Sequence, residues 1–355
     1  MKKIITTVAV LMFLLALSAP LAFAGVVSPQ PAAQDAAEEA AAYKAWYDAY
    51  TAKDLTKEME LGKTSVEKYP SSKYADFVKK DIVRVRSLML NQAVQAKNIP
   101  DIIRIGKEAM AADPEGVDYP YFLATQLRTL DTNYQYAADT AQFTQTAMRL
   151  IESGKKPTIV KDFKDKEVLA YFHDTLATID EHNKEADKAL EHYMQAATLD
   201  PVNARYFFNC GRLHQGRYAA AAAEYQKLPE ADRTAAEPKP EVKAALDKVN
   251  AEADGVINCW ARFMGLPKND YPADVKQKVM TALTDLYKYR NNGSDAGLTQ
   301  LIEANKTSPT PVKMTPPVEK PTAAADQKPA DAGAKPGNGQ PAAAAKPAPA
   351  KKPRL

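Results

Sequence analysis

Glycine residues give the first candidate for chemistry in this 355-residue chain. Gly211 and Gly216 have the glycine spacing of a phosphate-binding loop, which also requires a lysine and a magnesium-binding hydroxyl. Arg217 and Tyr218 follow instead, so we interpret Gly211 as a small residue in a helix and Gly216 as a turn between helices. The chain also has no Gly-x-Ser-x-Gly nucleophile motif.

The histidines show no metal-binding pattern. None belongs to a His-Glu-x-x-His pair, and no group of cysteines and histidines has metal-ligand spacing. We therefore predict no catalytic residue, no metal site and no cofactor. The four histidines are interpreted as ordinary surface residues: His173, His182, His192 and His214.

Cys210 and Cys259 are the only two cysteines. In an oxidising compartment an even pair can form a disulfide. Cys210 also occupies an apolar helical position, and Cys259 precedes Trp260 in a second helical pattern, so two buried free thiols are the alternative. Either state would be structural and would add no chemistry.

The segments that carry these residues read as helices. From residue 170 to 228, small and aromatic residues recur at the spacing of helix hairpins, in which small side chains let two helices approach closely. The first hairpin has Leu176 and Ala177, then Ala189, Tyr193, Ala196 and Pro201. The second has Phe207, Cys210 and Gly211, then Tyr218, Ala221 and Tyr225. This segment resembles the tetratricopeptide repeat family, but His173 and Asp180 replace expected aromatics and the second connection is two residues short.

The resemblance implies an all-α, right-handed α-solenoid with a concave groove lined by the first helix of each hairpin. The groove positions are Tyr171, Asp174, Thr178 and Glu181 in one hairpin, and Arg205, Phe208, Arg212 and Gln215 in the next. Arg205 and Arg212 could grip an acidic or C-terminal carboxylate beside Phe208. The lysine and asparagine set of the chaperone-tail clamp is missing, so recognition of chaperone tails is not expected.

Prolines divide the preceding chain into further helical segments. The junction Tyr69-Pro70-Ser71-Ser72-Lys73-Tyr74-Ala75 looks like one common in tetratricopeptide proteins of the bacterial envelope. An aromatic stripe with helical spacing is interpreted as core: Tyr43, Trp46, Tyr47 and Tyr50. Earlier hairpins are expected over 37–69, 72–114 and 117–154, within a repeat domain over 37–228.

The chain beyond the repeats is expected to cap them. Residues 229–240 are predicted to be a linker. Helices predicted over 241–264, 273–287 and 296–304 form a capping region, 241–305, which would cover the apolar face of the last repeat.

The first residues indicate export. Lys2 and Lys3 precede an apolar run that ends in Ala22-Phe23-Ala24, the pattern of a secretory signal peptide over 1–24, with cleavage before Gly25. A linker is expected over 25–36. The run is also long enough for an uncleaved membrane anchor, which is the alternative. No cysteine follows it, so a lipid anchor is not expected.

The body of the mature chain and its C-terminal segment differ in charge. Residues 25–305 hold 36 Lys and Arg against 41 Asp and Glu, whereas residues 306–355 hold 9 against 3. The latter segment also has 11 of the 25 prolines and is rich in alanine and lysine. So little apolar surface predicts a disordered, basic C-terminal tail over 306–355.

These features predict an exported, most simply periplasmic, scaffold that is not an enzyme and that binds an envelope protein or peptide in its groove. The alternative function is a tether that acts on anionic cell-wall polymers or lipids through the basic tail. A hydrolase of envelope polymers ranks below both, because no spacing singles out a pair among the 41 carboxylates. Nucleic-acid binding is not expected, and the identity of the partner and the oligomeric state stay open.

Overall fold

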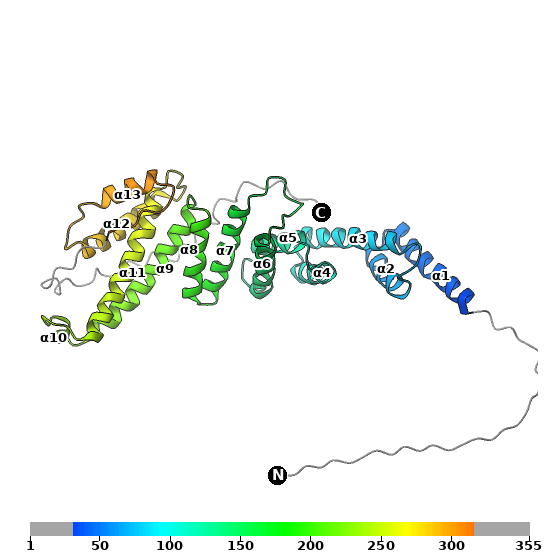
Figure 1. Ribbon diagram of the computed structural model, residues 1–355, viewed down its shortest axis with the longest axis horizontal. Helices are drawn as coiled ribbons and strands as arrows, with labels where there is room; N and C mark the ends of the chain where they lie inside the picture. Colours follow the sequence, from blue (N-terminus) through cyan, green and yellow to red (C-terminus); the bar gives the residue numbers. More distant parts are fainter. Residues whose placement is uncertain (1–30, 316–355) are drawn as a thin grey trace, which may run out of the picture. The chain divides into compact units, whose positions relative to one another are not determined.

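The computed structural model describes residues 31–315, with side chains from residue 35. Over this range the chain forms thirteen α-helices and no strand, which confirms the all-α prediction (Figure 1). The predicted signal peptide, its cleavage residues Ala22, Ala24 and Gly25, and residues 316–355 of the predicted tail lie outside the described residues. Among the described helices, none combines the length and apolar composition that a membrane span requires.

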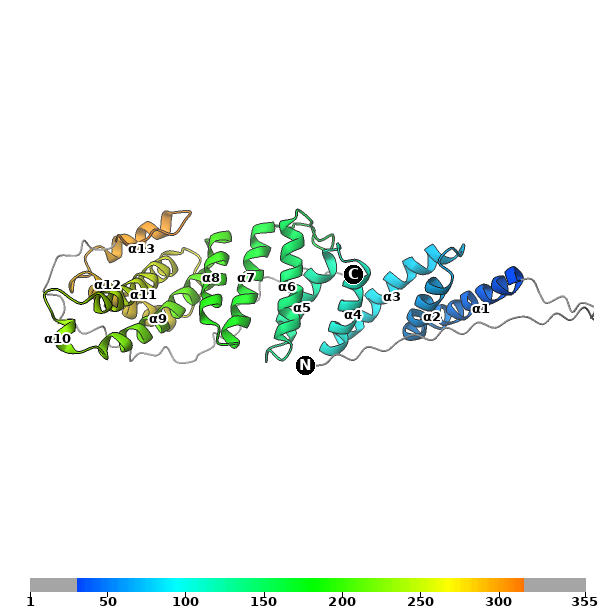
Figure 2. The same ribbon diagram turned by 60° about the horizontal axis from the view of Figure 1, so that its bottom comes forward.

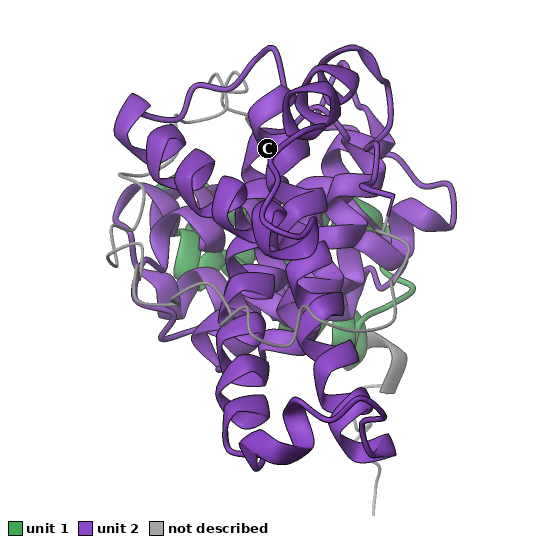
Figure 3. Ribbon diagram, turned by 90° about the vertical axis from the view of Figure 1, so that its left-hand side faces the viewer, with its two compact units in different colours: residues 1–85 green, residues 86–355 purple. Residues whose placement is uncertain are grey.

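The chain divides into two compact units, residues 1–85 and 86–355 (Figure 3). In the first unit α1 (Pro31–Ala52) packs against α2 (Leu55–Lys68). Helix α1 starts inside the predicted linker over 25–36, with a proline in its first turn, where no backbone N–H is needed. Trp46 is fully buried, but Tyr47 and Tyr50 are 46% and 37% exposed, so only part of the predicted aromatic core stripe is core.

The second unit continues as a series of helices. Helix α3 (Ala75–Gln95) leads into it and is followed by α4 (Ile99–Ala112), which packs against α5 (Asp118–Leu130). Two helix pairs come next: α5 with α6 (Ala137–Glu152), and α7 (Asp165–His182) with α8 (Ala186–Leu199). Buried residues from α3 to α7 form one apolar core that runs from Leu90 to Leu176.

Three of these helices, α2, α4 and α8, share one frame, and we call them the matched helices. Each has 14 residues. The fifth residue of each is a buried apolar side chain and the eleventh is a buried small one, so each presents the same buried stripe. The fifth residues are Met59, Ile103 and Leu190, and the eleventh are Ser65, Ala109 and Ala196.

The turns at both ends of the matched helices also correspond. A lysine with left-handed backbone precedes each helix: Lys53 (φ 58°), Lys97 (φ 55°) and Lys184 (φ 63°). The next residue donates its backbone N–H to the carbonyl five residues earlier, the bond that closes a helix before a turn. A proline stands two residues after each helix: Pro70, Pro114 and Pro201.

Helix α9 (Ala204–Gln226) differs from the sequence expectation of a hairpin that turns at Gly216. It is one continuous helix, because the connection is too short to reverse the chain and five alanines after Tyr218 favour helix strongly. Its partner is α11 (Pro240–Gly265), which lies beside it in both views (Figures 1 and 2). The predicted linker over 229–240 contains the short helix α10 (Glu230–Arg233).

The predicted boundary between repeat domain and capping region therefore falls between two closely packed helices. Helices α12 (Ala273–Arg290) and α13 (Leu298–Thr307) pack with α11 within a second apolar core, and both start within two residues of their predicted starts. The first ten residues of the predicted disordered tail are ordered. Met314 is buried, and the Asn305 side-chain amide bonds both backbone groups of Val312.

Candidate functional site

The predicted groove residues of α7 and α9 meet in a row of ion pairs. Asp174 on α7 is buried and accepts hydrogen bonds from Nε of Arg205 on α9, at 2.9 and 3.1 Å. Arg128 on α5 pairs with the same carboxylate. One buried carboxylate thus joins α5, α7 and α9, and the side chains of its two arginine partners are 19% and 24% exposed.

A second pair extends the row along the same two helices. Arg212 on α9 pairs with Glu181 on α7, which also accepts a 2.7 Å hydrogen bond from the hydroxyl of Tyr193 on α8. The Arg212 side chain is 36% exposed. We call the five charged residues the arginine row: Arg128, Asp174, Glu181, Arg205 and Arg212.

The charges of the arginine row do not cancel. Three guanidinium groups face two carboxylates, which leaves one positive charge in excess. Burial disfavours the charge of Arg205, but Asp174 outweighs that effect and raises the pKa of Arg205, so this guanidinium stays charged. The hydrogen bonds of Arg205 to Asp174 use Nε, which leaves both of its Nη groups for other acceptors.

The other predicted groove residues have different surroundings. Tyr171 lies under the Arg128 guanidinium, 5.0 Å from its ring centre, and Thr178 donates to the Asp174 carbonyl at 2.7 Å. Gln215 is half-buried on α9. Phe208 is half-buried and packs against Phe263 and Tyr271. Arg205 and Arg212 are each paired with an acid of α7, and the spacing of residues in the sequence could not reveal this pairing.

The predicted packing residues are buried between helices. Leu176 and Ala177 are buried on α7. Ala189, Tyr193 and Ala196 are buried on α8, and Gly211, Tyr218, Ala221 and Tyr225 on α9. Gly211 has no room for a Cβ atom, which would overlap the Trp260 ring of α11. Leu176 belongs to the core that runs from Leu90, and Ala196, Tyr218, Ala221 and Tyr225 belong to the second core. Pro201 is half-buried and acts through its carbonyl.

That carbonyl is held by Arg262 on α11, a residue that sequence reasoning missed. Arg262 is 1% exposed and donates to the Pro201 carbonyl from Nη2 at 2.7 Å. Its Nη1 donates to the carbonyls of Asn305 and Ser308, at the end of α13, at 2.6 and 2.8 Å. A buried guanidinium therefore ties the end of a matched helix to the end of α13, and no local sequence signal marks it.

Two histidines assigned to the surface lie against each other. The Nδ1 atoms of His173 on α7 and His192 on α8 are 3.0 Å apart. Burial lowers the pKa of His173 to about 4, and His192 adds to the fall. The His173 imidazole is therefore uncharged at neutral pH.

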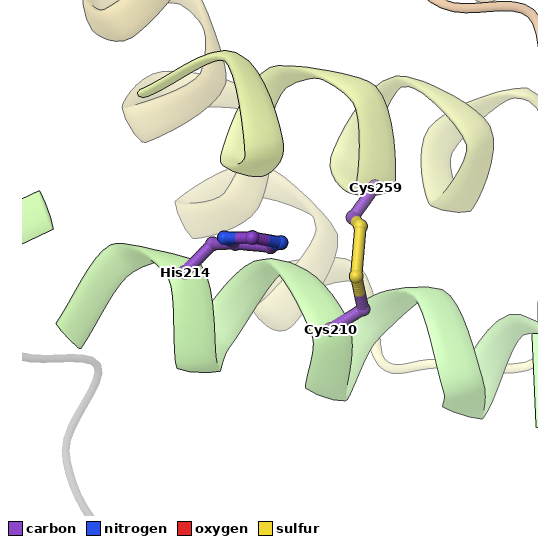
Figure 4. Close-up of side chains that lie close together, drawn as sticks. All are labelled: Cys210, His214 and Cys259. Atoms are coloured by element: carbon purple, nitrogen blue, oxygen red, sulfur yellow. A yellow bond between two sulfur atoms is a disulfide. The ribbon is translucent and has the colours of Figure 1, made fainter. Parts of the chain in front are cut away.

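The two cysteines form a disulfide between α9 and α11, with their Cα atoms 6.0 Å apart, so the structure has the bonded alternative (Figure 4). His214, one turn beyond Cys210, lies beside it, and the ligand atoms of Cys210, His214 and Cys259 are all within 4.8 Å of one another. The sequence predicted no metal site. The spacing of Cys210 and His214 was a usable signal, but Cys259 joins them only through the pairing of α9 with α11.

Comparison with protein-family models and with curated proteins finds no match to this chain.

Proposed function

We propose that this chain is an exported, non-enzymatic helical-repeat scaffold of the tetratricopeptide type, which binds an envelope protein or peptide along the arginine row. The observation that carries the proposal is the row itself. Five charged side chains from α5, α7 and α9 converge with one positive charge in excess, and the three arginines are 19% to 36% exposed.

The matched helices support the repeat part of this proposal. Tetratricopeptide hairpins reuse a second helix with fixed small and apolar positions and an ending proline. Helices α2, α4 and α8 share those positions, their length and both turns. A right-handed α-solenoid is the arrangement that such repeats form when they stack.

The charge of the row supports a partner with an exposed carboxylate. The Nη groups of Arg205 can donate to a carboxylate while its Nε stays bonded to Asp174. Arg212, whose side chain is 36% exposed, can donate to a carboxylate while it stays paired with Glu181. A partner that supplied one negative charge would neutralise the row. An acidic peptide or a C-terminal carboxylate has this chemistry.

Site-specific photocrosslinking in the native host tests the proposal. A photoreactive residue replaces Thr178 or Gln215, which lie next to the row, and Met194, a 51% exposed residue of α8, is the control position. We expect one discrete adduct from the first two positions and none from Met194. The adduct should weaken in Arg212→Gln and persist in Arg104→Gln, a more exposed arginine of α4 (52% against 36%). Adducts from Met194 alone, or equal loss in both arginine variants, would contradict the row as the binding site.

The charge difference along the sequence favours one second candidate, an envelope tether. Residues 306–355 carry a net charge of +6 against −5 for residues 25–305. In this alternative the helices are a folded spacer, and residues 316–355 bind anionic polymers or lipid headgroups. An uncleaved first segment would place the same scaffold at the membrane as an anchored protein.

A further inference from the structure

The disulfide of α9 and α11 is part of a cluster with the ligand set of a metal site. Cys210 and His214 stand one helical turn apart on α9 and project from the same face. Cys259 meets them from α11, and all three ligand atoms lie within 4.8 Å of one another. Figure 4 shows the imidazole turned toward the sulfur atoms, with one ring nitrogen at the near end.

A carboxylate orients this histidine. Nδ1 of His214 donates to Oε2 of Glu252 at 2.7 Å, which leaves Nε2 as the nitrogen that can bind another group. Histidines that bind metals commonly donate their other N–H to a carboxylate in this way. Arg217 donates to Oε1 of Glu252 at 2.8 Å, so the charge of the orienting carboxylate is itself balanced.

Space for the histidine comes from a glycine on the facing helix. A Cβ atom at Gly255 would overlap the imidazole of His214. Gly255 stands one turn before Cys259, as His214 stands one turn after Cys210, so the two helices present the ligands in antiparallel register. The histidine therefore sits in a fitted position beside the two sulfur atoms.

We propose that the reduced chain binds one Zn²⁺ ion through Cys210, His214 and Cys259, with Glu252 as the positioning residue. A dithiol reductant supplies two electrons and two protons, the Sγ–Sγ bond breaks, and the reductant leaves as its own disulfide. Zn²⁺ then displaces both thiol protons to solvent and forms two S–Zn bonds and one N–Zn bond. Nothing is oxidised or reduced in this second step.

The geometry suits a tetrahedral ion with one open position. With Zn–S bonds of about 2.3 Å, two tetrahedral sulfur ligands lie about 3.8 Å apart. Three protein ligands leave the fourth position to water, and His214 and Cys259 are partly exposed, which gives the ion a path of entry. Two thiolates neutralise the ion, so the site adds no net charge between the helices.

Cobalt titration of the full chain tests the proposal. The protein is reduced with a dithiol, freed of reductant without oxygen, and titrated with Co²⁺ and then Zn²⁺. We expect one equivalent of Co²⁺ with thiolate charge-transfer bands and tetrahedral visible bands, displaced by one equivalent of Zn²⁺. The oxidised protein should show neither.

Variants separate this site from adventitious binding. Cys259→Ser should remove most of the charge-transfer intensity, and His214→Ala should weaken Zn²⁺ binding at least tenfold. Glu252→Ala should weaken it by about ten- to a hundredfold, with partial rescue in Glu252→Gln, which keeps an acceptor for Nδ1–H. His182→Ala, at the exposed end of α7, is the matched control and should bind as the wild type does.

Three results would overturn the proposal: no thiolate bands in the reduced wild type, equal binding in the oxidised protein, or unchanged bands in Cys259→Ser. The wild-type titration needs no variant, so a variant that fails to fold leaves the test intact.

Discussion

Gly211 and Gly216 lie on the same helix, α9, but their surroundings differ. Gly211 is pressed against the Trp260 ring, whereas nothing lies within 4 Å of where a Cβ of Gly216 would be. The first glycine is required by packing, and the second only lowers helix stability.

Alanine substitutions at these two positions therefore form a matched pair. Both gain the same helix propensity, about 1 kcal/mol, so their difference isolates the overlap with Trp260. We expect Gly216→Ala to be more stable than Gly211→Ala by about 1–3 kcal/mol, the usual cost of overpacking. Urea denaturation measures the difference, and equal midpoints would show that α9 and α11 can separate at no cost.

Glu58 is a buried acid of the first unit, 1% exposed, with Asp81 and Arg84 against it. Burial raises the pKa of Glu58 from 4.5 to about 7, and Asp81 adds to the rise. Between these values the folded unit keeps a proton that the unfolded chain releases. Its contribution to stability is therefore full below pH 4.5 and is lost as the pH rises to 7.

We predict that the first unit becomes less stable from pH 4.5 to pH 7, and that Glu58→Gln flattens this dependence. The fluorescence of Trp46, in a Trp260→Phe background, reports unfolding of this unit alone. Glu60→Gln, an exposed change on the same helix, should keep the wild-type dependence. A wild-type stability that rises over this range would contradict the assignment.

At the scale of elements, the disulfide is the covalent bond between α9 and α11. It closes a loop with a sequence separation of 49 residues. The chain-entropy estimate for such a loop is about 4 kcal/mol of stabilisation.

We expect reduction, in the presence of a metal chelator, to lower the free energy of unfolding of the second unit by about 4 kcal/mol. Guanidinium denaturation with and without reductant measures the loss. The double variant with Cys210→Ser and Cys259→Ser should start at the reduced value and not respond to reductant. A wild type that is equally stable in both states would show that packing alone holds α9 to α11.

The sequence predicted where the helices lie in the chain more reliably than which helices pack against each other. Prolines and turn residues are local signals, so the starts of α11, α12 and α13 came within two residues. The turn predicted at Gly216 was wrong, because an isolated glycine suggests a turn unless the length of the connection is also considered. The acids that pair with Arg205 and Arg212, and the place of Cys259 beside His214, depend on contacts between helices and have no local signal.

At the scale of the whole molecule, the fold continues at least ten residues beyond the boundary that composition suggested. Asn305 binds Val312, Arg262 binds the Ser308 carbonyl, and Met314 is buried. Residues 306–315 thus belong to the folded body, despite their resemblance in composition to the tail.

Two truncations separate the body from the rest of the chain. A chain ending at Thr315 should keep wild-type stability, whereas one ending at Asn305 should lose about 3–5 kcal/mol through the Met314 burial and the lost hydrogen bonds. Thermal unfolding measures both. Equal stability of the two would show that residues 306–315 add nothing to the fold.

The chain ending at Thr315 also tests the tether. If residues 316–355 bind the envelope, the chain ending at Thr315 loses salt-sensitive sedimentation with envelope material while remaining folded. Retained sedimentation would leave the arginine row as the binding surface.

The bond between Cys210 and Cys259 also sets how far the chain can be drawn out. A polypeptide extends by at most about 3.5 Å per residue. The cysteines are separated by 49 residues in the sequence, and a force applied at the two chain ends cannot extend this segment while the disulfide is intact. The oxidised chain should therefore reach a contour about 170 Å shorter than the reduced chain in a single-molecule pulling experiment. The reach of the chain under load would then depend on the redox state of its surroundings.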